Sequence, residues 1–234
     1  MNFDQTNPQT VTSTALTNAF LRSVYKWMGL GLAVTALVSL AVVHTDAILL
    51  RLLESPGLIL ACVIAELALV FYLSSRIAKL SAGTATGLFL LYSALNGVTL
   101  SIILLAYTYS SVAQAFLTAT GMFVAMSVYG SVTKRDLSGI GSYLAMGLFG
   151  IIIASVINIF MNSTGLEFGI SLVGVVLFLA LTAYDTQFLK EMGNSVPQDD
   201  EVAVRRATII GALKLYLDFI NLFLFILRLM GRRR

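Results

Sequence analysis

Ionisable side chains lie inside stretches of this sequence that are otherwise apolar enough to cross a lipid bilayer. Four of them stand where lipid is expected, and a fifth stands close to the end of such a stretch: Glu66, Asp185, Lys214 and Asp218, with Arg228 as the fifth. A charge at the bilayer centre costs roughly 2.5–3.5 kcal/mol even on the lenient translocon-insertion scales. Such residues therefore face protein or water, and they mark ion pathways or proton-transfer sites.

The two aspartates, Asp185 in LTAYDTQFL and Asp218 in LYLDFINLF, could form a carboxyl pair. Two carboxylates held close together cannot both ionise easily, so they exchange protons as a unit. Such a pair can act as a pH switch. It can also attract Ca²⁺, which prefers carboxylate and carbonyl oxygens. The alternative is an ion pair along one helix, because Lys214 stands four residues before Asp218.

Glu66 also needs a partner, because it stands near the middle of an apolar run. A buried carboxylate is costly unless a cation or hydrogen-bond donors compensate it. Two arginines are candidates for that cation, Arg76 after the same run and Arg228 near the C-terminus.

Enzymatic classes fit these residues poorly. Paired transmembrane aspartates also occur in intramembrane aspartyl proteases, but the glycine-x-glycine-aspartate element of those enzymes is missing here. The sequence contains no metal-hydrolase spacing, phosphate-binding loop or nucleophile elbow. We therefore expect that the protein is not an enzyme and has no cofactor, with calcium only as a permeant or weakly bound ion.

The composition is that of an integral membrane protein. Of the 234 residues, 58% are hydrophobic and only 12% are charged, against about 25% charged in typical soluble domains. The net charge of +3 resides in short basic clusters between apolar runs, so we expect a lipid bilayer and no nucleic acid as partner. Seven apolar stretches are long enough to cross as helices: 27–44, 57–75, 85–107, 112–132, 139–161, 168–189 and 207–230.

The last stretch differs from the other six by a polar stripe. On a helix of 3.6 residues per turn, one slowly drifting line contains Gly211, Lys214, Asp218, Asn221, Phe225 and Arg228. A stripe of this kind faces protein or water rather than lipid. The sequence therefore predicts an all-α membrane protein in which six transmembrane helices surround a central C-terminal helix.

Basic residues predict the orientation of the chain. The N-terminal segment and the second, fourth and sixth connectors hold nine Lys and Arg, whereas the other three connectors hold only Arg51. The positive-inside rule then predicts a cytoplasmic N-terminus, although the C-terminal GRRR leaves the side of the tail open. Residues 1–20 are expected to form a mobile polar arm, and residues 21–234 a single seven-helix domain.

Three segments together resemble one protein family. The run GALKLYLDFINLFLFILRLMG, with LTAYDTQFLK and TKRDLSG, resembles the Bax inhibitor-1 family, also called transmembrane Bax inhibitor motif or Lifeguard-like proteins. The resemblance spans about residues 20–234 and is closest to bacterial inner-membrane members. It implies seven helices with a central seventh, and a pH-sensitive calcium leak.

The resemblance also implies roles for individual residues. Asp185 and Asp218 match the family's pH-sensing pair, and Glu66 matches its mid-membrane glutamate. Arg76 is the candidate for an arginine that latches the pair, and Arg228 is the implied partner of Glu66. Some bacterial relatives suggest the alternative of a non-conducting regulator that binds a membrane protease or stress machinery. The leading prediction is a multi-pass protein of the bacterial inner (plasma) membrane that leaks cations under control of the two aspartates.

Overall fold

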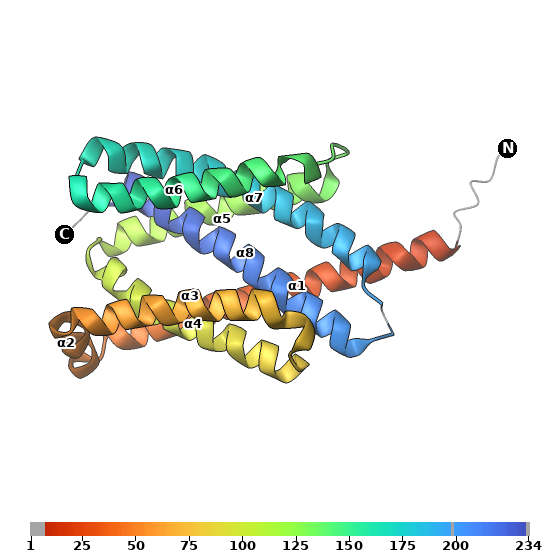
Figure 1. Ribbon diagram of the computed structural model, residues 1–234, viewed down its shortest axis with the longest axis horizontal. Helices are drawn as coiled ribbons and strands as arrows, with labels where there is room; N and C mark the ends of the chain where they lie inside the picture. Colours follow the sequence, from red (N-terminus) through yellow and green to blue (C-terminus); the bar gives the residue numbers. More distant parts are fainter. Residues whose placement is uncertain (1–7, 198, 233–234) are drawn as a thin grey trace. The chain divides into compact units, whose positions relative to one another are not determined.

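The computed structural model describes residues 8–197 and 199–232 of the chain, and every regular element in these residues is helical (Figure 1). Two short 3₁₀ turns, Ile77–Lys79 and Ser138–Ile140, precede α4 and α6. The helices are α1 (Pro8–Val43), α2 (Asp46–Glu54), α3 (Pro56–Arg76), α4 (Ala82–Leu105), α5 (Tyr109–Val132), α6 (Gly141–Met161), α7 (Thr164–Ser195) and α8 (Glu201–Met230).

All of these helices except α2 are long and apolar enough to cross a membrane. Their most apolar windows have mean hydropathies between 1.5 and 2.3. Helices satisfy every backbone hydrogen bond within one segment, which is the requirement for crossing hydrocarbon. The seven predicted spans are therefore confirmed.

The spans differ most in how far they are enclosed by protein. In the part of the chain that the structure describes, 72% of the residues in the most apolar stretch of α8 are buried. The corresponding share is 11–44% for the other six spans. The C-terminal span is therefore the enclosed one, as its polar stripe predicted. Asp218 is buried within this helix, whereas Lys214 is partly exposed and Arg228, near its end, is exposed.

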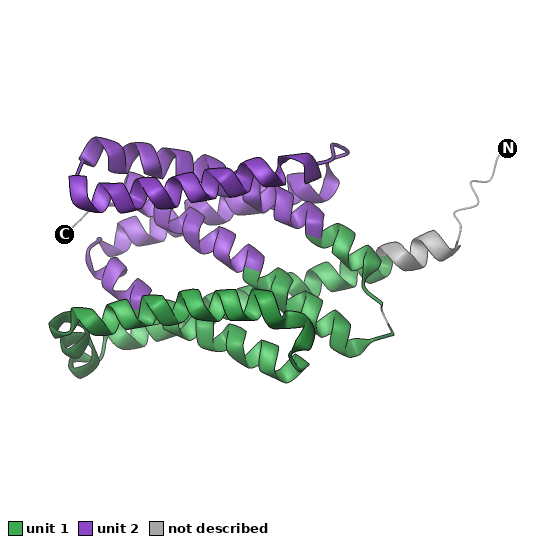
Figure 2. Cartoon of the chain, in the orientation of Figure 1, with its two compact units in different colours: residues 1–98, 189–213 green, residues 99–188, 214–234 purple. Residues whose placement is uncertain are grey.

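The chain forms two compact units (Figure 2). Unit 1 contains residues 1–98 and 189–213, and unit 2 contains residues 99–188 and 214–234. The boundaries fall inside α4, α7 and α8, so the chain passes between the units along continuous helices. The single domain expected over 21–234 stays a prediction.

In unit 1, α1 begins earlier than the apolar pattern suggested. Residues 8–20 of the expected arm belong to α1, while residues 1–7 lie outside the described residues, so the arm's mobility stays a prediction. Phe20, Val24 and Met28 are buried at four-residue spacing, and the Thr17 hydroxyl donates a hydrogen bond to the Asn194 side chain. A buried face thus continues from α1's apolar part back to Thr17, among residues that are mostly polar.

The structure also contains a helix that the sequence pattern did not predict. Helix α2 has only nine residues, too few to cross a bilayer. Leu52 is buried on one side, whereas Ile48, Leu50 and Leu53 are exposed. Such a helix, between two spans and with apolar residues exposed, is typical of the membrane interface.

Aromatic and small residues pack α8 within unit 2. The Phe219 ring meets Phe116 and Phe123 of α5 edge to face, with ring centroids 5.4 and 5.6 Å apart. Gly174 of α7 lies so close to the Phe225 ring that a Cβ there would approach it to 2.7 Å. The small residue therefore lets α7 and α8 come close together.

The C-terminal end of α8 lies beside the start of α5. The backbone N–H of Arg232 donates to Ser111 Oγ at 3.0 Å, and the N–H of Thr108 donates to the Arg232 carbonyl at 3.1 Å. Since α5 and α8 are both spans, the tail lies on the same membrane face as the α4–α5 connector. If the N-terminus is cytoplasmic, that face is the outer one, against the positive-inside preference of the arginines.

Candidate functional site

Asp185 of α7 and Lys214 of α8 form an ion pair inside unit 2. Lys214 Nζ donates to Asp185 Oδ1 at 2.9 Å. The side chain of Asp185 is only 7% exposed, while that of Lys214 is 37% exposed and passes over the Phe188 ring, with Nζ 5.2 Å from its centroid. The ammonium group thus lies near both a buried carboxylate and the face of an aromatic ring.

Asp218 lies one turn after Lys214 and is buried, with 4% of its surface exposed. Its Oδ2 atom has no hydrogen-bond partner among the residues that the structure describes. Both Asp185 and Lys214 act on it electrostatically. With both carboxylates ionised, the three groups carry one net negative charge, and a single added proton makes them neutral.

We call Asp185, Lys214 and Asp218 the carboxyl cluster. It combines the two arrangements that the sequence left open, because the aspartates interact and Lys214 takes part. The lysine reaches across to Asp185 rather than along its own helix to Asp218. The ion pair that Lys214 forms is therefore not the same-helix pair that the sequence offered as the alternative.

Helix geometry explains this choice of partner. Asp185 stands ten residues before the end of α7 at Ser195, and Lys214 thirteen residues after the start of α8 at Glu201. At a rise of about 1.5 Å per residue these distances are roughly 15 and 20 Å along the two helices. Asp218 lies about 6 Å farther along α8. A long lysine side chain spans the remaining offset. Counting residues from the α7–α8 connector along both helices would have predicted this pair.

Close packing fixes the segment of α7 that carries Asp185. A Cβ on Gly130 of α5 would overlap the carbonyl oxygen of Ala183, so the two helix backbones nearly touch. Farther along α7, Gln187 accepts a hydrogen bond from Leu137 N at 2.7 Å and donates one to the Arg135 carbonyl at 2.9 Å. The aspartate therefore projects from a helix that is anchored on both sides.

Glu66 lies in unit 1, with only 9% of its surface exposed. Asn96 Nδ2 of α4 donates to Glu66 Oε2 at 3.4 Å, and the buried Tyr92 interacts electrostatically with the same carboxylate. The sequence pattern did not connect Asn96 or Tyr92 with Glu66. Two neutral polar side chains of α4 thus interact with this acid.

The two arginines that were candidate partners occupy other positions. Arg76 is exposed at the end of α3 in unit 1, whereas the carboxyl cluster belongs to unit 2, so the latch stays a prediction. Arg228 belongs to unit 2, where its guanidinium lies 5.4 Å from the centroid of the Phe225 ring. Because Glu66 is part of unit 1, their pairing also stays a prediction.

The cluster suits a compensating lysine better than a resident metal ion. Calcium takes six to eight oxygen ligands in proteins. The described residues contain no group of three or more His, Cys, Asp or Glu side chains that could hold a metal. A Ca²⁺ ion held by Asp185 and Asp218 would also have to displace the ammonium of Lys214.

Comparisons with known proteins cover almost the whole chain. The family model described as "Inhibitor of apoptosis-promoting Bax1" matches residues 17–234. The inner membrane protein YbhL of Escherichia coli K12 is 48% identical over 92% of both chains. A Borreliella burgdorferi protein is 46% identical over 93% of both chains, and one from Deinococcus radiodurans is 42% identical over 92% of this chain and 90% of its own.

Proposed function

The chain belongs to the Bax inhibitor-1 family of membrane proteins, and on that premise we propose that it is a pH-sensitive cation leak channel. Calcium is the proposed permeant ion, and Asp185 and Asp218 are the proposed gate. The protein would act in the bacterial inner membrane, since the relative from Escherichia coli carries that location in its name. A leak of this kind involves no chemical step and needs no cofactor.

One observation carries the proposal. The Asp218 carboxyl is buried beside a second carboxylate, and its Oδ2 finds no hydrogen-bond partner in the described part of the chain. Burying an ionised carboxylate without such a partner costs several kcal/mol, whereas a neutral carboxyl costs much less. The packing around Asp218 therefore responds to the binding and release of one proton.

Lys214 donates a hydrogen bond to Asp185, so the two aspartates differ in what a proton would change. A proton on Asp185 would replace a charge-assisted hydrogen bond to Lys214 by a weaker one. A proton on Asp218 breaks no such bond. We assign the gating proton to Asp218 and the fixed negative charge to Asp185, within a pair that exchanges protons as a unit.

The charge of the cluster connects the proton with ion flow. The cluster carries one net negative charge when both aspartates are ionised, which favours a cation nearby. One added proton removes that attraction, and it also removes the repulsion between the carboxylates. Both effects follow from the same proton, so the flux of cations should depend on pH.

The decisive experiment measures calcium flux through the purified protein in liposomes that contain a calcium dye, between pH 5 and 8. We expect a pH-dependent leak for the unmodified chain. D218N imitates the neutral carboxyl, so its flux should match the acidic limit of the unmodified chain at every pH. D185N should also change the pH profile. The exposed carboxyl of Asp136 supplies the matched control, D136N, which should leave the profile intact.

Two outcomes would contradict the proposal. One is a leak with unchanged pH dependence in both D218N and D185N, which would remove the gate. The other is the absence of any leak in a folded protein that co-purifies with a stoichiometric membrane protein. That second outcome would favour the alternative function, a non-conducting regulator of a membrane protease or stress machinery.

A further inference from the structure

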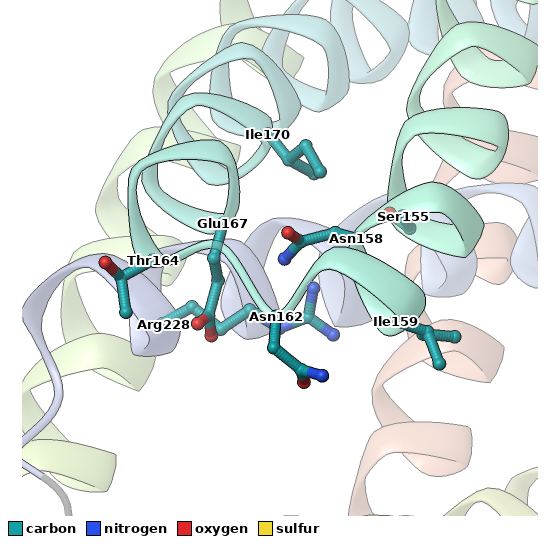
Figure 3. A pocket seen from close by; sticks show the side chains of 8 residues that line it. All are labelled: Ser155, Asn158, Ile159, Asn162, Thr164, Glu167, Ile170 and Arg228. Atoms are coloured by element: carbon teal, nitrogen blue, oxygen red, sulfur yellow. The ribbon is translucent and has the colours of Figure 1, made fainter.

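A half-open cavity of about 430 Å³ lies in unit 2, away from the carboxyl cluster. Figure 3 shows the residues that line it, which come from the end of α6, the following turn, the start of α7 and the end of α8. It is at the end of unit 2 where α6 connects to α7 and where α8 finishes. The cavity therefore opens at the same membrane face as the C-terminal tail.

The lining of this cavity is mainly polar, although the surrounding helices are apolar. Among the described residues that line it, Ile159 and Ile170 are apolar, and the polar ones are Ser155, Asn158, Asn162, Thr164, Glu167 and Arg228. Hydroxyl, amide, carboxylate and guanidinium groups together offer donors and acceptors to a single ligand. A cavity of this composition suits a small, highly polar group.

A sharp turn between α6 and α7 shapes the cavity. Asn162 adopts a left-handed conformation, with φ of 48° and ψ of 38°, and ends α6. The Asn158 side-chain oxygen accepts a hydrogen bond from Ser163 N at 3.1 Å, which fixes the turn. The first turn of α7, with Thr164 and Glu167, consequently returns toward α6, so both helices line the same cavity.

Opposite charges line this cavity. Arg228 contributes a guanidinium from α8, and Glu167 contributes a carboxylate from α7. Arginine presents a planar set of donors that matches phosphate oxygens, and a carboxylate attracts an ammonium group. A permeating cation would meet the arginine, and a purely anionic group would meet the glutamate. A ligand that carries both charges complements both residues.

An exposed apolar strip continues from the cavity along α6. Ile159 lines the cavity and is also 69% exposed, and Ile152, Val156 and Phe160 are exposed at helical spacing beside it. Only 11% of the apolar window of α6 is buried, so this helix presents most of its surface to lipid. Acyl chains can therefore lie along α6 while a headgroup occupies the cavity.

We propose that this cavity binds a zwitterionic phospholipid, with the phosphate at Arg228, the ammonium at Glu167 and the acyl chains along α6. The site is separate from the proposed leak, and its test does not depend on ion flux. Its ligand belongs to the membrane leaflet next to the C-terminal tail, which is the outer leaflet if the N-terminus is cytoplasmic.

The test uses the full chain, delipidated in detergent and then offered phosphatidylethanolamine or phosphatidylglycerol, with lipid retention measured by native mass spectrometry. We expect the unmodified chain to retain more phosphatidylethanolamine than phosphatidylglycerol. R228Q should weaken retention of both on the order of tenfold, because it removes a charge-assisted bond to phosphate. E167Q should remove the preference between them. R135Q changes an exposed arginine outside the cavity and serves as the control.

A second measurement separates a lipid from a soluble zwitterion. Phosphoethanolamine without acyl chains should displace the bound lipid only at far higher concentration, since the acyl chains contribute to binding. Equal retention of the two lipids by the unmodified chain would overturn the proposal, as would R228Q that retains lipid like R135Q. If soluble phosphoethanolamine competes as well as the phospholipid does, the site would be one for a soluble zwitterion. That result would also overturn the proposal.

Discussion

Buried acids in the two units are accommodated by different chemistry. In unit 2, Asp185 is paired with the ammonium of Lys214 at 2.9 Å, and Asp218 lies beside this pair. In unit 1, Glu66 lies near the neutral groups of Asn96 and Tyr92. When an acid is paired with a charged group, its protonation state depends on every charge nearby. Hydrogen bonds from neutral donors stabilise an acid without this dependence. The carboxyl cluster is therefore the better candidate for a switch, and Glu66 for a structural contact.

The strongest test of this comparison is removal of the lysine. Lys214→Met should leave the buried Asp185 without its cation and lower the free energy of unfolding by about 3 kcal/mol, the low end for a broken buried pair, because Lys214 is 37% exposed. Unfolding by denaturant in detergent micelles measures the change. D185N combined with Lys214→Met should recover most of the loss, and the exposed Lys134→Met should lose little. A single variant as stable as the unmodified chain would contradict the role given to Lys214.

Removal of the neighbouring carboxyl, that of Asp218, should instead raise the free energy of unfolding. D218N replaces a buried carboxyl by a neutral group of the same shape, so near neutral pH we expect a gain of about 1–2 kcal/mol in the free energy of unfolding. The same variant should flatten the dependence of stability on pH. Unfolding curves at several pH values measure both effects. A loss of stability with an unchanged pH profile would mean that Asp218 has a partner that stabilises its ionised form.

Substitutions at the buried acid of unit 1 should change the free energy of unfolding less. Glu66→Gln keeps an oxygen that can accept the hydrogen bond from Asn96, so the expected loss is below about 1 kcal/mol in the free energy of unfolding. Asn96→Ala should have an effect of similar size. If Glu66→Gln instead destabilises as much as Lys214→Met, then a cation such as Arg228 or Arg76 compensates Glu66, and the contrast between the units fails.

An exposed carboxyl outside the membrane gives the smallest expected effect. Hydrogen bonds from the side chain and backbone of Ser138 hold the pKa of Asp136 below its ordinary value. Because the pKa is lowered in the folded state, this contribution to stability is present above the ordinary pKa and is lost as the pH falls through the folded pKa. Ser138→Ala should move the pKa back toward its ordinary value in a carbon-13 NMR titration. No movement would assign the shift to the backbone bond alone.

Much of the fold could be predicted because it depends on local composition. Apolar length identified the seven spans, and the stripe through Lys214 and Asp218 identified α8 as the enclosed helix. The start of α1 and the existence of α2 were missed. The start of α1 is rich in polar residues, and α2 has only nine residues, so neither stands out as an apolar stretch long enough to cross a bilayer.

The candidate site was predictable in its members but not in its contacts. The sequence named Asp185, Asp218 and Lys214 as candidates, but it left open whether the lysine pairs with the aspartate on its own helix or the two aspartates pair with each other. The pairing across helices depends on how far each residue stands from the α7–α8 connector and on the rotation of both helices. The polar cavity beside Arg228 went unnoticed for a similar reason, since its residues come from three helices.

The amino-acid sequence by itself determined that this chain is a membrane protein of seven helices with acids in its interior, because hydrophobic length and helical period are properties of each segment alone. Tertiary structure decided which charges meet, and it placed the tail at the face of the α4–α5 connector through the bonds of Arg232 with Thr108 and Ser111. Ion pairs and hydrogen bonds act over a few ångströms, and only the packing of helices brings distant residues that close.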